Sequence, residues 1–156
     1  MSVDAQPIDL GVLMALAYGQ FVLELRANLA EEGFDDLGRS DGYVFRALDA
    51  ASMTTSELAE RLRISKQGAG QIVADMQARG YVGPGAADPA DRRARRLTLA
   101  PRGERALAAA RRFHQGYERR LRRTHGAARV TELRELLVAM AGAGGPVDPE
   151  LRGLYI

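Results

Sequence analysis

The 156-residue chain contains no cysteine, which excludes several kinds of chemistry at once. Disulfide bonds, thiolate metal ligands, a cysteine nucleophile and a thiol redox switch all require this residue. Histidine is scarce as well, and the two that are present, His114 and His125, fall about three turns apart on one predicted helix. That separation is too large for both to bind one metal ion, so we expect no metal site and no cofactor.

Signals for targeting and catalysis are also missing. No basic segment precedes an apolar stretch near the first residue, and the most apolar window, residues 10–25, is short and interrupted by Gln20 and Glu24. No nucleophile, base and orienting group occur at a suggestive spacing, and no glycine-rich phosphate loop follows a predicted strand. We therefore expect a cytoplasmic protein that is not an enzyme and has no membrane partner.

Charge is distributed unevenly along the chain. The formal net charge is only +2, but residues 1–60 carry −8, residues 61–123 carry +11 and residues 124–156 carry −1. A basic middle section between acidic flanks is typical of proteins that contact phosphates, although a solvated charged helix surface gives the same pattern. With 46% hydrophobic residues, the chain is long enough for one domain with a substantial core.

Apolar residues at helical spacing predict long helices near both ends of the chain. Residues 9–31 are apolar on more than one side, a width that suits burial against two partners. A second helix is expected over residues 42–50. Pro101 suits the first turn of a long helix over about 101–124, and apolar residues between 130 and 140 mark a last helix.

Two short helices are predicted in the middle of the chain. Thr54 and Glu57 have capping-box spacing at the start of a helix over residues 55–62. Ser65 can cap the next helix, which we expect to end before Gly80, because glycine readily adopts the left-handed conformation there. Two short helices joined by a tight turn indicate a helix-turn-helix.

A β-hairpin is expected directly after this helix pair. Tyr81 and Val82 can begin a strand, residues 96–99 alternate like its antiparallel partner, and residues 83–95 form the long basic loop between them. The predicted fold is therefore mainly α with a small β-hairpin wing.

The second helix of the pair has one side that suits a DNA groove. Four residues are expected to face inward, namely Ala69, Ile72, Val73 and Met76. Gln67, Gln71 and Ala74 lie opposite them, with Lys66 and Gly70 beside them. Amide side chains can pair bidentately with adenine, and small residues let the backbone come close to the bases. An ordinary amphipathic surface helix gives the same pattern, and the basic hairpin that follows favours the DNA interpretation.

The hairpin tip, DPADRRARR over residues 88–96, is the second predicted DNA contact. Arginine suits a narrow, electronegative minor groove, and nearby acids can hold arginines in position before DNA arrives. Asp91 and Arg93 are the preferred supporting pair.

The order of these segments resembles the MarR family over nearly the whole chain. The resemblance is carried by TSELAERL, ISKQGAGQIVADMQARGYV and DPADRRARRLTLAPRG, which lie between long terminal helices. It implies a homodimer built from residues 9–31 and 101–142, a winged helix-turn-helix lobe over residues 42–100, and a C-terminal tail over residues 143–156, all within a single domain spanning residues 1–156.

The resemblance also implies functional residues. Ser65, Lys66, Gln67 and Gln71 match contacts of the recognition helix, and Asp91, Arg92 and Arg93 match the wing. Adding Gly70 and Arg95 completes the expected DNA-binding set. A ligand cleft between the lobe and the dimer region would involve five further candidates, namely Tyr18, Tyr43, Arg46, His114 and Tyr117.

Several positions depart from the family pattern. Ala90 replaces the usual first wing arginine, Gly83-Pro84-Gly85 replaces a segment that is often polar, and Ala100 lacks a capping hydroxyl. Gly68 and Gly70 loosen the recognition helix, because glycine has a low helix propensity. We interpret Gly68 as making the helix slack before DNA binds. For Gly70 two interpretations stand, namely slackness and close approach of the backbone to DNA.

The expected function is sequence-specific binding of double-stranded DNA by a homodimeric transcription regulator, a repressor that responds to a small molecule and acts on an inverted repeat. The alternative is a winged-helix module that binds a protein and has lost specific DNA binding. The retained Lys66, Gln67 and Gln71, together with the wing arginines at 92, 93, 95 and 96, argue against this alternative.

Overall fold

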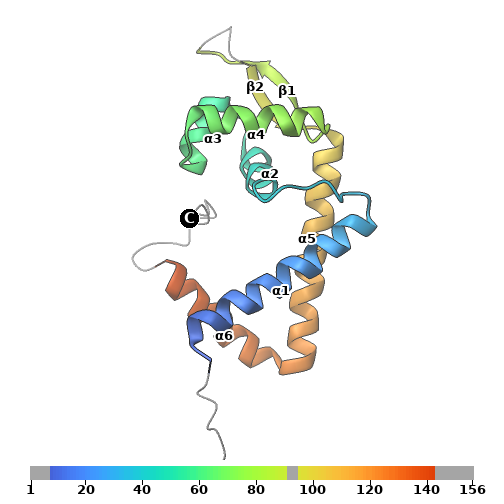
Figure 1. The fold of residues 1–156 in the computed structure, drawn as a ribbon, viewed down its shortest axis with the longest axis vertical. Helices are drawn as coiled ribbons and strands as arrows, with labels where there is room; N and C mark the ends of the chain where they lie inside the picture. The colour runs from blue at the N-terminus through green and yellow to red at the C-terminus, as the bar shows by residue number, and fades with distance from the viewer. Residues whose placement is uncertain (1–7, 91–94, 143–156) are drawn as a thin grey trace, which may run out of the picture. The chain divides into compact units, whose positions relative to one another are not determined.

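A computed structural model describes residues 8–90 and 95–142 of the chain. The chain divides into two compact units, one extending to Asp36 and one beginning at Leu37. The elements, shown in Figure 1, are α1 (Leu10–Glu31), α2 (Asp41–Ala50), α3 (Thr55–Leu62), α4 (Lys66–Ala78), β1 (Val82–Ala87), β2 (Arg95–Leu99), α5 (Pro101–His125) and α6 (Ala127–Ala141). The predicted fold, mainly helical with one small hairpin, is confirmed.

The first unit contains α1, and this helix ends in a glycine cap. Gly33 has a φ of +88°, and the amide of Phe34 donates to the carbonyl oxygen of Leu29 at 2.9 Å. Among the described residues, α1 is the one helix long and apolar enough to cross a membrane by length and composition alone. This is weak evidence for a membrane span, because apolar helices of soluble proteins share these properties.

The second unit contains the predicted helix pair, which follows α2. Thr54 accepts from the amide of Glu57 at 3.2 Å, and the Glu57 carboxylate accepts from the amide of Thr54 at 2.7 Å, so the capping box is present. Helix α3 ends at Leu62, and the next residue, Arg63, adopts a left-handed conformation with a φ of 54°. This residue makes the tight turn into α4. Gly80, with a φ of +76°, follows α4 and lets the Tyr81 amide donate to Met76 at 2.9 Å.

The hairpin differs from the sequence prediction, because β1 continues to Ala87 where a loop was expected from Gly83. Strand β1 pairs antiparallel with β2, and the register shifts between Pro84 and Ala87. The amide and carbonyl of Leu97, opposite Pro84, are both hydrogen-bonded to Met53. Pro84 therefore occupies a position where no cross-strand N–H is needed, so proline and glycine are compatible with this edge strand.

The core of the second unit draws on every element of the lobe and on the start of α5. Its buried apolar side chains include Val44, Phe45, Leu48, Met53, Leu58, Ala69, Val73, Met76, Tyr81, Val82, Leu97, Ala106 and Leu107. Helices α3 and α4 thus lie on the same core as the hairpin. Burial of their apolar faces is what orients the opposite, polar side of α4 outward.

Helices α5 and α6 form a helical hairpin around Gly126, which has a φ of +92°. Arg122 secures the turn by donating to Glu118, at 2.8 Å from Nη2, and to the Thr131 hydroxyl at 3.2 Å. These bonds to Arg122 hold the pKa of Glu118 below its usual range. Beyond the turn, only Val130 of α6 is buried.

Candidate nucleic-acid interface

The N-terminal half of α4 presents a polar surface, as the sequence predicts. Its inward residues, including Ala69, Val73 and Met76, are buried. Lys66, Gln67 and Gln71 are exposed, and Gly70 beside them is half-buried. The structure therefore brings these candidate residues together on one face, where slim and polar side chains suit a major groove.

Ser65 and Gly68 are linked by the cap of this helix. The Ser65 hydroxyl accepts from the amide of Gly68 at 3.0 Å, so this hydroxyl is used to begin α4. A methyl group at Gly68 would lie 3.1 Å from the same oxygen, whereas a methyl at Gly70 would meet nothing within 4 Å. Gly68 therefore leaves space for the Ser65 cap. This packing role is not predicted by the sequence, from which Gly68 is interpreted only as loosening the helix.

The C-terminal end of α4 is anchored by Arg79. Its guanidinium donates to both oxygens of Asp41, at 2.7 and 3.3 Å, and also pairs with Asp75. Asp41 is the one buried charged side chain among the described residues, and it also accepts from the amide of Gly38 at 2.8 Å. Hydrogen bonding to Asp41 raises the pKa of Arg79, with Asp75 contributing further, so the guanidinium stays charged.

Tyr81 strengthens this anchor. Tyr81 is fully buried, and two guanidinium groups lie over its ring, that of Arg79 at 5.4 Å and that of Arg102 at 4.4 Å from the ring centroid. Arg102 also donates to the carbonyl oxygen of Arg79 at 2.6 Å. The end of α4 is thus tied to α2 through Asp41 and to α5 through Arg102.

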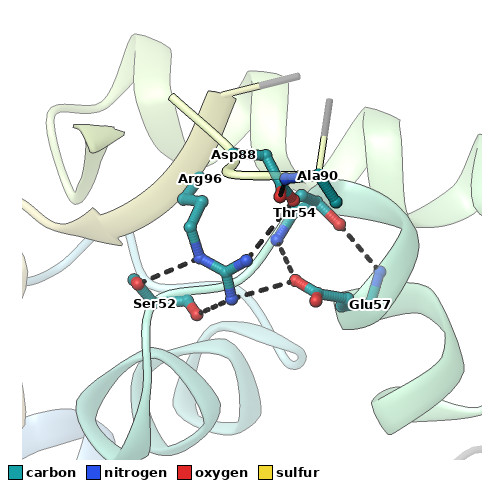
Figure 2. A network of polar contacts seen from close by, with 6 residues as sticks. All are labelled: Ser52, Thr54, Glu57, Asp88, Ala90 and Arg96. Carbon is teal, nitrogen blue, oxygen red and sulfur yellow. Dashed lines mark hydrogen bonds and ion pairs between the residues drawn. The ribbon is translucent and has the colours of Figure 1, made fainter. Parts of the chain in front are cut away.

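The predicted wing residues are only partly within the described chain. Asp91, Arg92 and Arg93 lie outside the described residues. Arg95 is exposed at the start of β2, as a residue predicted to contact DNA should be. Arg96 differs from Arg95, because its guanidinium turns toward Ser52, Glu57 and Asp88, as Figure 2 shows.

The candidate ligand residues fall in both units. Tyr18 is exposed on α1 in the first unit. In the second unit, burial lowers the pKa of His114 below its ordinary value, and the charge of Arg46 lowers it further. The structure therefore places Arg46 of α2 and His114 of α5 within electrostatic reach of one another. Tyr117, one turn beyond His114, packs against Phe113 with ring centroids 5.9 Å apart.

Tyr43 is half-buried on α2, one turn before Arg46.

Sequence reasoning did not identify the partners of Asp41, Arg79 and Arg96. Arg79 and Asp41 are 38 residues apart in the sequence, and Arg96 and Ser52 are 44 apart. These contacts form only through tertiary packing, so the sequence gives little signal for them. An isolated acid at the start of a predicted helix also has an ordinary role as a partner of the helix dipole.

Residues 35–94 match the sequence model of the MarR family. This part of the chain is similar to the winged helix-turn-helix of that family. The match covers α2, α3, α4 and β1 and confirms the resemblance carried by the sequence motifs. No match was found among curated proteins.

Solved structures extend the likeness beyond residues 35–94. YusO from Bacillus subtilis is 15% identical, with a TM-score of 0.67 over 92% of this chain and 100% of that chain. FabT from Streptococcus pneumoniae, solved in complex with DNA, is 17% identical, with a TM-score of 0.70 over 85% of this chain and 92% of that one.

The transcriptional repressor CouR, solved with a 23-mer DNA duplex, is 22% identical, with a TM-score of 0.68 over 90% of this chain and 98% of that one. At these identities the likeness establishes the fold.

Proposed function

We propose that the chain is a transcription regulator that binds double-stranded DNA sequence-specifically as a homodimer. It acts in the cytoplasm as a ligand-responsive repressor on an inverted repeat and catalyses no reaction. The match of residues 35–94 to the MarR family supports DNA binding, as do the similar folds of FabT and CouR, which were solved with DNA.

The observation that carries the proposal is the one-sided burial of α4. Its apolar residues are in the core, while Lys66, Gln67 and Gln71 are exposed beside a hairpin that presents Arg95. In this arrangement the amides read base edges and the arginine contacts phosphate. An amphipathic helix alone would not require a basic hairpin next to it.

The exposed apolar side chains support the homodimer. Every exposed large hydrophobic residue of the described chain lies in residues 8–23 or 133–140. Leu136, for example, is 63% exposed and Leu10 is 69% exposed. Exposed apolar side chains on each of these segments indicate an interaction site, and a second copy of the chain would cover them with matching helices. We propose residues 9–31 and 101–142 as the dimerisation segments and residues 42–100 as the DNA-binding lobe.

The ligand response is supported by Arg46 and His114. A carboxylate or phenolate ligand would be attracted by the charge of Arg46, and its own charge would favour the protonated form of His114. Such a ligand should therefore bind more tightly as the pH falls toward 6. Calorimetric titration at two pH values checks this, with Arg46→Ala as the variant that should lose binding.

The DNA-binding proposal is tested by selecting duplexes from a random pool with the full chain. We expect an inverted repeat whose half-sites are about 10 bp apart, because each subunit of a two-fold dimer presents one recognition helix. Gln67→Ala and Gln71→Ala should then relax base preference at one position of each half-site, each by about 5-fold to 150-fold, the loss of one bidentate contact.

Gln77→Ala is the matched control, because Gln77 is also an exposed glutamine of α4 but lies in its last turn. It should leave base preference unchanged. A pool that yields no enriched sequence would instead favour a winged-helix module that binds a protein. Equal effects of Gln67→Ala and Gln77→Ala would show that α4 does not read bases in this orientation.

A further inference from the structure

Arg96 is the second residue of β2, next to the loop end of the hairpin, but its guanidinium is directed into the lobe. Its Nε donates to the Ser52 hydroxyl at 3.2 Å, and its Nη2 donates to the Ser52 carbonyl oxygen. The same Nη2 lies 3.2 Å from a carboxylate oxygen of Glu57, and Nη1 lies 3.4 Å from one of Asp88 (Figure 2). One side chain thus contacts the segment before α3, the first turn of α3, and the end of the first hairpin strand.

Two of these partners also organise the backbone around them. Glu57 completes the α3 capping box by accepting from the amide of Thr54 at 2.7 Å. Asp88 accepts from the amide of Ala90 at 2.8 Å, which fixes the turn after β1. Arg96 therefore joins two locally ordered turns that are far apart in the sequence.

The backbone beside Arg96 continues this connection. The amide of Leu97 donates to Met53 at 2.7 Å, and the amide of Met53 donates back to Leu97 at 3.4 Å. These two bonds hold β2 against the segment before α3, but they do not involve β1. Arg96 connects the end of β1 to that segment, because its guanidinium contacts both Asp88 and Ser52.

The chemistry of the site requires an arginine. A planar guanidinium can reach acceptors in several directions at once, whereas a lysine ammonium acts as a point charge at the end of a flexible chain. The Arg96 side chain is 24% exposed and that of Asp88 only 12%, so this pair is partly shielded from solvent. Glu57, at 49% exposure, adds a weaker contact.

We propose that Arg96 is a positioning residue for DNA binding. It locks the loop end of the hairpin against the N-terminus of α3, so that α4 and the hairpin approach one duplex as a preorganised unit. The inference rests on the proposed DNA-binding function and deepens it: Arg96 acts through Glu57 and Asp88 and makes no contact with phosphate itself. Preorganisation of this kind tightens binding because less conformational freedom is lost on association.

The test uses Glu57→Gln combined with Asp88→Asn in the full chain. Both amides can still accept the backbone hydrogen bonds from Thr54 and Ala90, while the charge pairs with Arg96 are lost. The direction of the effect is diagnostic. Removing two negative charges strengthens DNA binding if only the net electrostatic field matters, whereas loss of positioning weakens it.

Affinity for the selected duplex is measured by fluorescence anisotropy under conditions where circular dichroism shows every variant to be folded. We expect the double variant to bind about 10-fold more weakly, with the same base preference as the wild type, because the recognition residues of α4 are intact. Arg96→Lys should also weaken binding, although it conserves charge. Glu60→Gln is the matched control, since it removes an exposed acid from the same helix and should leave affinity equal or slightly tighter.

The possible failures are distinguishable. A wild-type chain that prefers no duplex overturns the proposed function, and the inference with it. A wild type that binds its duplex, while the folded double variant binds equally or more tightly, overturns the inference alone. The same holds if Arg96→Lys retains full affinity. If the double variant fails to fold, Asp88→Asn alone decides the matter, because weaker binding supports positioning and unchanged or tighter binding refutes it.

Discussion

The two glycines of the recognition helix should respond differently to alanine, although both interrupt the same helix. At Gly70 the space for a methyl group is open, with no neighbouring atom within 4 Å. Alanine is favoured over glycine inside a helix by about 1 kcal/mol, so Gly70→Ala should raise the free energy of unfolding by that amount. For a chain of this size the midpoint of thermal unfolding should rise by about 3 °C.

At Gly68 the same gain is opposed by the helix cap. The new methyl group would lie 3.1 Å from the Ser65 hydroxyl oxygen, which accepts the bond that begins α4. A serine cap contributes about 1 kcal/mol, so displacing the hydroxyl would cancel the gain in helix propensity. We therefore expect Gly68→Ala to leave the unfolding midpoint nearly unchanged.

Thermal unfolding of both variants at one fixed chain concentration measures this difference, since the concentration affects the midpoint of a dimer. Stabilisation by Gly68→Ala equal to that by Gly70→Ala would refute the argument from the cap. Measuring the DNA affinity of Gly70→Ala then distinguishes the two possible roles of this glycine. If Gly70→Ala is more stable but binds DNA more weakly, the glycine serves close approach to the duplex, and equal or tighter binding indicates a helix that is slack before binding.

Three further perturbations test the packing, the electrostatics and the assembly. Gly103→Ala would place a methyl group 2.2 Å from the carbonyl oxygen of Tyr81, so we expect a loss of about 3 kcal/mol or more in urea unfolding, and wild-type stability would contradict the packing described. Burial and the charge of Arg46 lower the pKa of His114, so the unfolded chain takes up this proton first as the pH falls below 6.5. Stability should therefore decrease between pH 7 and 5, and His114→Gln should show a smaller decrease. Leu136→Glu should convert the dimer to a monomer in light scattering, because it puts a charge into the proposed interface, and an unchanged dimer would exclude Leu136 from it.

The elements that local signals specify were predicted well. Thr54 and Glu57 form the expected capping box, Ser65 caps α4, and Gly80 ends it in the left-handed conformation. Each of these features depends on residues within a few positions of one another. The inward face of α4 was also predicted, because helical periodicity relates its residues directly.

The extent of β1 and the network of Arg96 were not predictable in the same way. Gly83, Pro84 and Gly85 have the composition of a loop, and only the pairing of Leu97 with Met53 makes an edge strand with proline acceptable. The inward orientation of Arg96 likewise depends on acceptors brought close by folding. A run of basic residues in a sequence does not distinguish side chains that contact DNA from those that hold the lobe together.

The central claim is tested most directly by titrating the full chain with duplex DNA from the region upstream of its own gene. A scrambled duplex of the same length and composition is titrated in parallel at physiological salt. We predict at least about 1,000-fold tighter binding to the upstream duplex, with two chains bound per duplex. Equal affinity for the two duplexes, or no binding to either, would contradict the assignment of this fold to sequence-specific DNA recognition.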